Sequence, residues 1–526
     1  MHCNRRKPLL LAAAILLFLP PRALHAIPAF SRLYGTSCST CHLDFPKLND
    51  FGKAFKDAGF KFPKDDEQFL KIPPIMLGAP AQAELWPHTV FPGTIPGLPP
   101  IGLRYNTYYQ QVSSNRDHFN QVLPSGTIGN FIPKSDFQPG YFSIFTAGNL
   151  GSEISFWADD DISVAGANAN GALGDAYLRF GNLSRFLKLP TDSLNLRAGQ
   201  FELDLPFSQA RSWNLSGWDI FSQANIGVQN GIGPPENVNN GSALANAADG
   251  VEVSGGHTYQ GYHYSLAAFD QNTSRVYLSP PNISPQNSVS FKSDSNFKDL
   301  YGRVVYRFNL ERDRASRDGV QAAGATGPRD HTYLSLGTFG FYGRTVQNTS
   351  GVLTNGSPTV LTAREPFYRI GGDVNFNYRT FNLFGVYMAA YDHDLIPITA
   401  AGAAAPTGFA RGTAVTFSGG FIEGDYLVMP WVMAIMRWDQ VKSTSDRVNF
   451  IEYDPSAPPA SSYFSPYGAT RNRLTPGIQF LIHANIKASM EYQFRPQQIV
   501  YNPVTGLPLT HAFRTNATVV ALEWVY

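Results

Sequence analysis

Cysteine is scarce in this chain, which contains only three such residues. Cys3 lies in a segment that we expect to be removed, so the mature protein keeps Cys38 and Cys41 alone. Two thiols separated by two residues exclude a disulfide framework, and they fall short of the roughly four ligands of a structural zinc site. Both mature cysteines therefore belong to one local motif.

Long apolar runs are also missing. After the amino-terminal segment, no stretch reaches the roughly 18 apolar residues that indicate a membrane helix. Charged residues are few, at 15%, whereas aromatic residues reach 13% and glycine and proline are frequent. Short alternating segments with aromatic ends and Gly/Asn turns instead predict a transmembrane β-barrel, whose closed sheet satisfies every backbone group in lipid.

Several enzyme signatures are absent from the sequence. It contains no phosphate-binding glycine loop after a strand, no nucleophile elbow and no His-Glu-x-x-His motif. Removing residues 1–26 takes away four basic residues and no acidic ones, which leaves 37 basic against 40 acidic residues and a formal charge of −3. This balance gives no reason to expect nucleic acid as a partner.

The start of the chain predicts export. Arg5-Arg6-Lys7 precedes a short apolar stretch, Leu9 to Leu19, and Ala23-Leu24-His25-Ala26 offers a cleavage point. The apolar stretch is too short to span a bilayer as a helix. We therefore expect residues 1–26 to be a signal peptide that directs the chain out of the cytoplasm.

A few residues into the expected mature chain lies Cys38-Ser39-Thr40-Cys41-His42. Cys-x-x-Cys-His is the attachment pattern of c-type haem, in which both thiols form thioethers and the histidine binds the iron. We expect a helical turn to place both sulfurs on one side. A redox dithiol would not need the histidine, and zinc would need a second cysteine pair. The motif predicts one covalent haem c held by Cys38, Cys41 and His42.

Residues 27–70 are expected to form a small helical haem unit, followed by a linker at 71–100. Phe30 and Tyr34 precede the motif on one side. After it, the stretch from Phe45 has a helical pattern in which Leu48, Phe51, Phe55 and Ala58 recur at helical spacing and Gly59 caps the end. We expect Phe51 and Phe55 to lie against the porphyrin. The unit is too small to cover a haem alone, so we expect it to fold into the barrel's periplasmic half.

Residues 101–526 predict a sixteen-stranded antiparallel barrel. Polar and apolar residues alternate clearly in several strands, for example Tyr368 and Ile370 against Arg369 and Asp373. The predicted strands are 101–112, 139–148, 150–161, 173–181, 193–203, 249–256, 260–271, 299–310, 332–343, 366–378, 380–391, 412–428, 430–441, 472–483, 485–495 and 514–526.

Connections after odd-numbered strands are mostly long, as at 113–138, 204–248, 344–365 and 392–411. Those after even-numbered strands are mostly short. Long outer loops and short periplasmic turns are typical of outer-membrane barrels, so both chain ends should lie in the periplasm. The terminal Tyr526 resembles the assembly signal of bacterial outer-membrane proteins.

The leader, the haem motif, the segment Phe45-Pro46-Lys47-Leu48-Asn49 with Phe51-Gly52, and the barrel together resemble the fused outer-membrane cytochrome–porins. The best-known members are monohaem Fe(II)-oxidising cytochromes. The resemblance is specific over 28–63 and architectural over the barrel. It implies an electron-transfer protein, or Fe(II) oxidase, that is surrounded by outer-membrane lipid. Its partners would be an extracellular electron donor such as Fe(II) and a periplasmic electron carrier, either a cytochrome or a cupredoxin.

The sixth haem ligand stays open. Met76 is the nearest downstream thioether, and a His/Met pair would raise the reduction potential. Because Ile75, Leu77 and Ala79 alternate around it, Met76 equally suits a strand. His88 is the alternative ligand, and a five-coordinate iron is the third case.

Further candidates concern metal binding and the haem surroundings. Asp159-Asp160-Asp161 and Asp392-His393-Asp394 offer carboxylate and imidazole ligands at strand ends, although such clusters are usually solvated loop anchors. Lumen-facing Arg303, Arg307 and Glu491 are candidates for the haem propionates and surroundings.

Three functions stay open at this point. The first is an electron conduit with the haem as its single redox centre, and electron export to extracellular acceptors is the same conduit run in reverse. The second is a diffusion porin with a haem-containing plug or sensor. The third is an enzyme that acts on a small substrate at an open haem site.

Overall fold

The fold is taken from a computed structural model of the chain. It describes residues 29–44, 47–62, 75–76, 80–85, 94–95, 99–112, 135–150, 153–163, 172–207, 215, 244, 247–270, 276–278, 289–291, 298–310, 332–352, 358–443, 451–454, 461–464, 472–483, 485–494 and 516–526. The predicted signal peptide, residues 63–70 and His88 lie outside the described residues.

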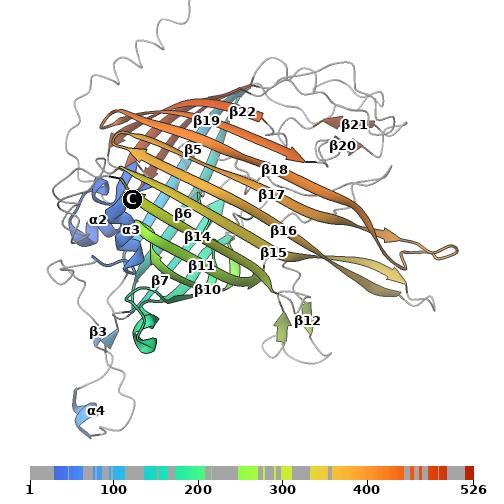
Figure 1. The fold of residues 1–526 in the computed structure, drawn as a ribbon, viewed down its shortest axis with the longest axis horizontal. Helices are drawn as coiled ribbons and strands as arrows, with labels where there is room; N and C mark the ends of the chain where they lie inside the picture. The colour runs from blue at the N-terminus through green and yellow to red at the C-terminus, as the bar shows by residue number, and fades with distance from the viewer. Residues whose placement is uncertain are drawn as a thin grey trace, which may run out of the picture.

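Sixteen antiparallel strands close into one barrel (Figure 1). The last strand pairs with the first, for example Trp524 with Tyr105, so the sheet has no free edge. The barrel strands are β5 (Ile101–Val112), β6 (Ser135–Asn149), β7 (Ile154–Ser163), β8 (Ala172–Phe180), β9 (Asn195–Phe201), β10 (Ala248–His257), β11 (Gln260–Asp270), β14 (Asp299–Asn309), β15 (Tyr333–Val352), β16 (Pro358–Tyr378), β17 (Phe381–Ile398), β18 (Gly408–Met429), β19 (Val432–Ser443), β22 (Asn472–His483), β23 (Ile486–Gln493) and β24 (Ala517–Val525).

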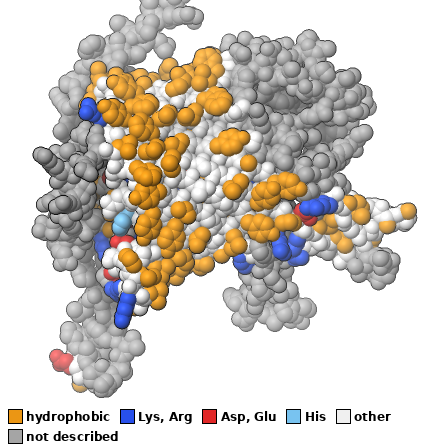
Figure 2. Space-filling view, in the orientation of Figure 1, with side chains coloured by type: hydrophobic (Ala, Val, Ile, Leu, Met, Phe, Trp, Pro, Cys, Tyr) orange, Lys and Arg blue, Asp and Glu red, His pale blue; other side chains and the backbone are white. Residues whose placement is uncertain are grey.

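The predicted number and order of the strands are confirmed, and so is the alternation of outward apolar and inward polar residues. On β16, Tyr368 and Ile370 are exposed while Arg369 and Asp373 are buried in the lumen. The same alternation on β14 turns Val304 outward and Arg307 inward. Figure 2 shows the resulting apolar side chains spread over the barrel's outer face. A closed barrel with this outer face lies in the bacterial outer membrane.

Four strands are longer than predicted. β15 pairs with β16 from Tyr333–Asn377 out to Val352–Pro358, so most of the predicted loop 344–365 is strand. β17 and β18 likewise extend into the predicted loop 392–411, up to Ile398 and from Gly408. The outer parts of β15 and β16 carry Thr, Gln and Asn instead of alternating apolar residues, and the outer part of β17 contains Asp392-His393-Asp394 and Pro397, so both patterns favour a loop. The backbone ladder forms regardless of this polarity.

The described amino-terminal unit, residues 29–62, lies at the end of the barrel where the chain's carboxyl terminus also lies (Figure 1). It contains α2 (Ala29–Tyr34), the 3-10 turn η1 (Cys38–Thr40), the paired strands β1 (His42–Asp44) and β2 (Lys47–Leu48), and α3 (Asp50–Asp57). The helix expected from Phe45 therefore begins only at Asp50, because Lys47 and Leu48 pair with β1 and Asn49 caps the helix.

Beyond this unit the described elements are short. β3 (Ile75–Met76) pairs with β4 (Thr94–Ile95), and α4 is Pro80–Leu85. In the outer loops, β12 (Val276–Leu278) pairs with β13 (Val289–Phe291), and β20 (Ile451–Asp454) with β21 (Ser461–Phe464). Among the described residues, no helix is long and apolar enough to cross a membrane.

A second segment enters the lumen directly after β9. Leu203, Leu205 and Phe207 are buried there, together with Leu215 and Leu244. They pack against inward-facing aromatic residues of the barrel wall, and the rings of Phe207 and Phe384 lie 4.7 Å apart. We call residues 202–207 the inner segment. The prediction that 204–248 is wholly an outer loop is therefore wrong at these positions. The signal was the apolar alternation in Phe201-Glu202-Leu203-Asp204-Leu205, which continues the inward face of the strand.

Candidate functional site: a thiol–histidine motif in the barrel mouth

The Cys-x-x-Cys-His motif is held by a buried asparagine. Asn49, only 3% exposed, donates from Nδ2 to the carbonyl oxygens of Ser39 (3.2 Å) and Thr40 (3.0 Å). Its Oδ1 accepts a hydrogen bond from the backbone N–H of Gly52 at 2.9 Å, which caps α3. One side chain thus joins the motif to the helix that follows it.

The motif turns more tightly than expected. The predicted helical turn is a 3-10 turn over Cys38–Thr40, and His42 already belongs to β1. A tight turn of this kind keeps Cys38 and Cys41 near each other, since the Cys41 N–H bonds to the Cys38 carbonyl at 3.1 Å. Both cysteines are free thiols.

Both thiols favour the protonated form. Burial raises the pKa of the Cys38 thiol, although a hydrogen bond with Ser31 opposes the shift. Burial, followed by the charge of Cys38, raises the pKa of Cys41 to about 12. Redox-active dithiols have lowered pKa values, because the thiolate is the reactive form. This environment therefore argues against the redox-dithiol interpretation.

Gly52 allows α3 to approach the motif closely. A Cβ atom at this position would lie 2.2 Å from the carbonyl oxygen of Cys41 and 2.9 Å from Leu48. No side chain fits there without moving the helix away from the motif. The Phe51-Gly52 pair in the sequence thus has a packing reason.

The aromatic side chains of α3 belong to a larger aromatic cluster. It is formed by Phe30, Tyr34, Phe51, Phe55, Phe60, Phe62 and Trp157. Phe55 is the centre of this cluster, with its ring 5.0 Å from Phe30 and 5.6 Å from Tyr34. Phe60 reaches the barrel wall, 5.5 Å from Trp157 on β7. Phe51 and Phe55 thus pack among protein rings in this structure, and their contact with a porphyrin stays a prediction.

Polar contacts fasten the unit to the lumen wall at several strands. The Arg307 guanidinium donates to both Asp50 carboxylate oxygens, at 2.7 and 2.6 Å, and lies 3.5 Å above the Tyr333 ring. Lys47 pairs with Asp425 at 3.0 Å. Asp57 accepts two hydrogen bonds from Thr258, both 2.9 Å long. These contacts place residues 29–62 inside the barrel mouth, as a plug.

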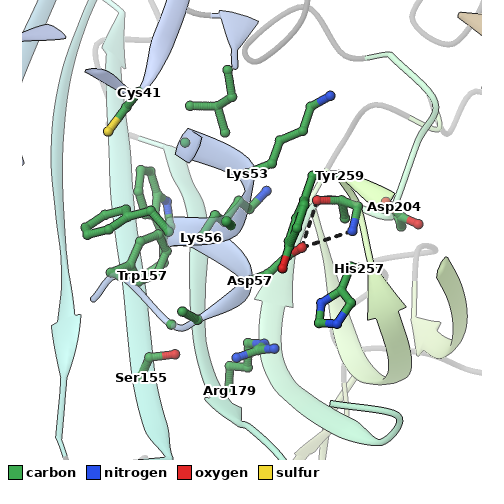
Figure 3. Close-up of a pocket in the computed structure, with 18 of the residues that line it drawn as sticks. Cys41, Lys53, Lys56, Asp57, Ser155, Trp157, Arg179, Asp204, His257 and Tyr259 are labelled. Atoms are coloured by element: carbon green, nitrogen blue, oxygen red, sulfur yellow. Dashed lines mark hydrogen bonds between the residues drawn. The ribbon is translucent and has the colours of Figure 1, made fainter. Parts of the chain in front are cut away.

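A cavity of about 780 Å³ lies between the plug and the inner segment. Cys38, Cys41 and His42 line it from the plug, and Leu203 and Phe207 from the inner segment. Figure 3 shows Cys41 on one side of it and Asp204 and His257 on the other. Cofactor and ligand pockets commonly measure about 300–1,000 Å³.

The motif and the cavity fit a covalent haem. Two protonated thiols and one histidine that line the same cavity are the donor set of c-type attachment. The wall carries both aromatic rings, such as Trp157, and cations, such as Arg303. These groups suit a porphyrin face and its carboxylates.

The predicted propionate partners divide into two groups. Arg303 and Arg307 both line the cavity, but each already pairs with protein carboxylates: Arg303 with Asp373 at 3.0 Å, and Arg307 with Asp50. Glu491 is not among the described residues that line the cavity, and it accepts a hydrogen bond from Gln493 at 2.6 Å. The structure therefore does not bring Glu491 to the site.

The structure does not bring Met76 to the motif. Met76 lies in β3, which Figure 1 shows apart from α2 and α3. His88 lies outside the described residues, so both assignments stay predictions. Two histidines that the sequence did not single out, His257 and His263, do line the cavity.

The two acidic clusters considered as metal ligands are not seen to form a metal site. Asp159 of the first makes hydrogen bonds within the protein, and the side chains of the second are not described. Asp159 accepts hydrogen bonds from the Trp157 indole (2.7 Å) and from the backbone of Asp175 (2.9 Å). Asp392-His393-Asp394 continues β17 past a bulge and does not open a loop, and its side chains lie outside the described residues. Among the described residues, no group of three His, Cys, Asp or Glu side chains is arranged to hold a metal ion.

Some contacts at the site could not be foreseen. Asp204 of the inner segment lies 3.2 Å from His263 and within 3.5 Å of Arg303. Burial raises the pKa of the Asp204 carboxyl, but the neighbouring Arg303 and His263 outweigh it and hold that pKa far below its usual value. The three residues lie on separate segments, so only the closed barrel brings them together.

We expect Asn49→Ala to lower haem incorporation sharply. The change leaves the Ser39 and Thr40 carbonyls without their side-chain donor and removes a helix cap, which together cost about 1–3 kcal/mol. Haem per barrel is measured from the absorbance of the pyridine complex in the purified protein.

Asn49→Asp is the matched variant for this prediction, since it keeps the cap acceptor for Gly52 and loses only the two donated bonds. If the motif contacts matter, it should resemble Asn49→Ala more than the wild type. Full haem content in both variants would contradict the role given to Asn49.

Comparison with known proteins finds similarity in the barrel fold alone. No family model matches the chain, and no curated protein is similar in sequence. Among solved structures, OmpT of Vibrio cholerae has a TM-score of 0.39 and 7% identity over 82% of this chain and 98% of its own. An anion-selective porin from Comamonas acidovorans has a TM-score of 0.40 and 10% identity over 81% and 98%. OprB of Pseudomonas putida has a TM-score of 0.39 and 10% identity over 81% and 94%.

Proposed function

We propose that this outer-membrane barrel is an electron-transfer protein with a single c-type haem in its periplasmic mouth. Electrons would pass from an extracellular donor, Fe(II), to a periplasmic carrier such as a cytochrome or cupredoxin. The observation that supports this most is the Cys38–Cys41–His42 motif, held by Asn49 beside an enclosed cavity in the barrel mouth.

Each residue of the motif has a defined task in this proposal. Cys38 and Cys41 anchor the group through thioethers, and His42 occupies one axial position. The bound haem supplies a one-electron Fe(III)/Fe(II) couple. The plug holds these residues inside the barrel, and its ion pairs with Arg307 and Asp425 fix their depth.

The barrel wall contributes protection and a shortened path. The membrane band of such barrels is about 25 Å tall. A redox centre within the mouth divides this distance into two shorter electron-transfer steps. Leu203 and Phe207 cover the cavity on its lumen side and limit the approach of water. The polarity of a haem's surroundings is one of the factors that set its potential.

A diffusion porin is the second candidate. A closed sixteen-stranded barrel with ionisable lumen residues, such as Glu423, Arg437 and Arg473, supports it. In that case the motif would serve as a plug or sensor. The inner segment and the plug, which both occupy the described lumen, favour the electron-transfer proposal instead.

Stopped-flow mixing with Fe(II) tests the proposal. The purified, oxidised protein should show one haem that titrates as a one-electron couple, and Fe(II) should convert its visible spectrum to the reduced form. Asp270 pairs with Lys298 away from the motif, so a variant with Asp270→Asn serves as a control for the spectrum. A haem-loaded protein that Fe(II) does not reduce would contradict the Fe(II) donor, and solute flux through the intact barrel would favour the porin.

A further inference from the structure

The turn between β8 and β9 exposes an unusual set of side chains. Phe186 is 70% exposed, Leu187 62% and Leu189 48%, in and just after the 3-10 turn η4 (Leu183–Leu187). We call residues 181–192 the β8–β9 turn. Most neighbouring turns at this end are only a few residues long, so this one projects from the rim.

The β8–β9 turn is firmly built. Asn182, Lys188 and Asp192 all adopt left-handed backbone conformations, at φ 50°, 57° and 60°. The Asn182 side chain accepts hydrogen bonds from Ser184 (2.8 Å) and from the backbone of Asp192 (3.3 Å). Such a preorganised surface loses little entropy when a partner binds.

Two cations frame the apolar side chains. Arg185 and Lys188 are both exposed, and the Arg185 guanidinium lies 4.9 Å from the Phe186 ring centre. Glu153 is a nearby acid, 3.7 Å from Arg185. An apolar centre with a cationic rim suits a partner whose own apolar face is ringed by carboxylates.

The turn also lies beside the cavity that holds the motif. Arg179 and Asn182, at its base, line the same cavity as Cys41. Lys53 and Lys56 of α3 line it as well, among acidic residues such as Asp57 and Asp192, so cations of the turn and of the plug face one cavity. Figure 3 shows Arg179 across the cavity from Cys41 and below Lys56.

We propose that the β8–β9 turn is the docking surface for an acidic periplasmic electron carrier. This rests on the proposed function, since it names the partner surface of the same site. In the transfer, one electron leaves the Fe(II) haem and reduces the oxidised carrier, Cu(II) to Cu(I) in a cupredoxin, and no proton or bond changes. Transient redox complexes bury less than about 1,200 Å², which a surface of this size can supply.

Lipid headgroups are the competing occupant of an apolar and basic turn. The position beside the cavity mouth, and not only on the barrel's outer face, favours the carrier. A test that separates the two must therefore measure binding as well as electron transfer.

Binding is measured on the full chain in lipid nanodiscs, with a spin label on Phe186→Cys. Wild-type protein treated in the same way is the blank for Cys38 and Cys41. The probe is plastocyanin, a cupredoxin with an acidic patch, in its redox-inert zinc form. We expect the label to be accessible to an aqueous nickel chelate and to become protected when the probe is added.

Electron transfer is followed by oxidation of the reduced haem with copper plastocyanin. Charge steering changes association rates by about 10–1,000-fold. We therefore expect Arg185→Glu with Lys188→Glu to slow the reaction at least about ten-fold at low salt, and added salt to remove most of the difference. The same variant should react faster than wild type with basic mitochondrial cytochrome c. Arg379→Glu, at another exposed turn of this rim, is the matched control and should change neither rate more than about two-fold.

Three results would overturn the docking surface: a label at position 186 that is accessible to oxygen in lipid but not to the aqueous chelate, no protection by the zinc probe, or equal rates for the charge-reversal and control variants. In a protein that contains reducible haem, these results leave the proposed function intact. A protein without covalent haem that still binds the zinc probe would contradict the proposed function and support the surface.

Discussion

Replacing both Cys38 and Cys41 with serine is expected to abolish covalent haem while the barrel still inserts into the membrane. The two thiols are the only cysteines of the predicted mature chain, so no other residue can form a thioether. The barrel should persist, because its closed ladder runs from β5 to β24 without involving the motif. The effect is all or none, which makes it the largest expected from any substitution in the protein.

Haem staining of a denaturing gel is the measurement, because only covalently attached haem stays with the chain. His42→Ala should also lose normal incorporation, since it removes the axial ligand. Ser39→Ala is the matched control: this exposed residue lies between the cysteines, and its hydroxyl contacts only Ser37 among the described bonds, at 2.8 Å. An undiminished band in the double serine variant would contradict haem attachment.

Removing the plug is expected to have the second largest effect. Deleting residues 27–70 should raise the single-channel conductance of the barrel about ten-fold, because sixteen strands enclose an aqueous lumen that the plug now fills at one end. The rise should remain below that of an open pore, since Leu203, Leu205 and Phe207 stay buried in the lumen. Planar bilayer recordings of both proteins measure it.

A milder variant keeps the plug but weakens its attachment. Asp50→Asn combined with Asp425→Asn removes the carboxylates that pair with Arg307 and Lys47. Breaking a fully buried pair from one side costs about 3–5 kcal/mol, because the remaining charge is left uncompensated. The cost here is smaller, since the Asp50 side chain is 26% exposed. This variant should show intermittent openings, whereas Asp270→Asn, whose partner Lys298 is exposed outside the lumen, should not. Equal, large conductance for the whole protein and the deletion would mean that no plug exists.

Much of the barrel was predictable because its strands repeat a simple alternation. In β23, Met490 is exposed and Glu491 is buried, as the alternation predicts. The extended hairpin of β15 and β16 was missed because its outer part, such as Gln347 to Ser350, is polar on both faces, and the extension of β17 was missed because Pro397 and a charged run interrupt its pattern. Pairing there depends on the backbone ladder, which leaves no mark in side-chain hydropathy.

The site was predictable where a motif is local and obscure where the barrel assembles it. Cys38, Cys41 and His42 are adjacent in sequence, so their spacing alone indicated the chemistry. The pairs Asp50–Arg307 and Asp204–Arg303 join residues far apart in the chain, and only barrel closure brings them together. Asn49 was part of the recognised segment, yet its double contact with Ser39 and Thr40 required coordinates.

Electron transfer across a sealed membrane is the decisive measurement for the proposed function. The full protein is placed in liposomes that enclose oxidised plastocyanin together with the iron chelator ferrozine, and Fe(II) is added outside. We expect the enclosed plastocyanin to be reduced while ferrozine stays colourless, and the Cys38→Ser/Cys41→Ser variant to reduce none. Coloured ferrozine with the wild-type protein would show that Fe(II) itself enters through an open pore, and plastocyanin that stays oxidised would contradict electron transfer through the barrel.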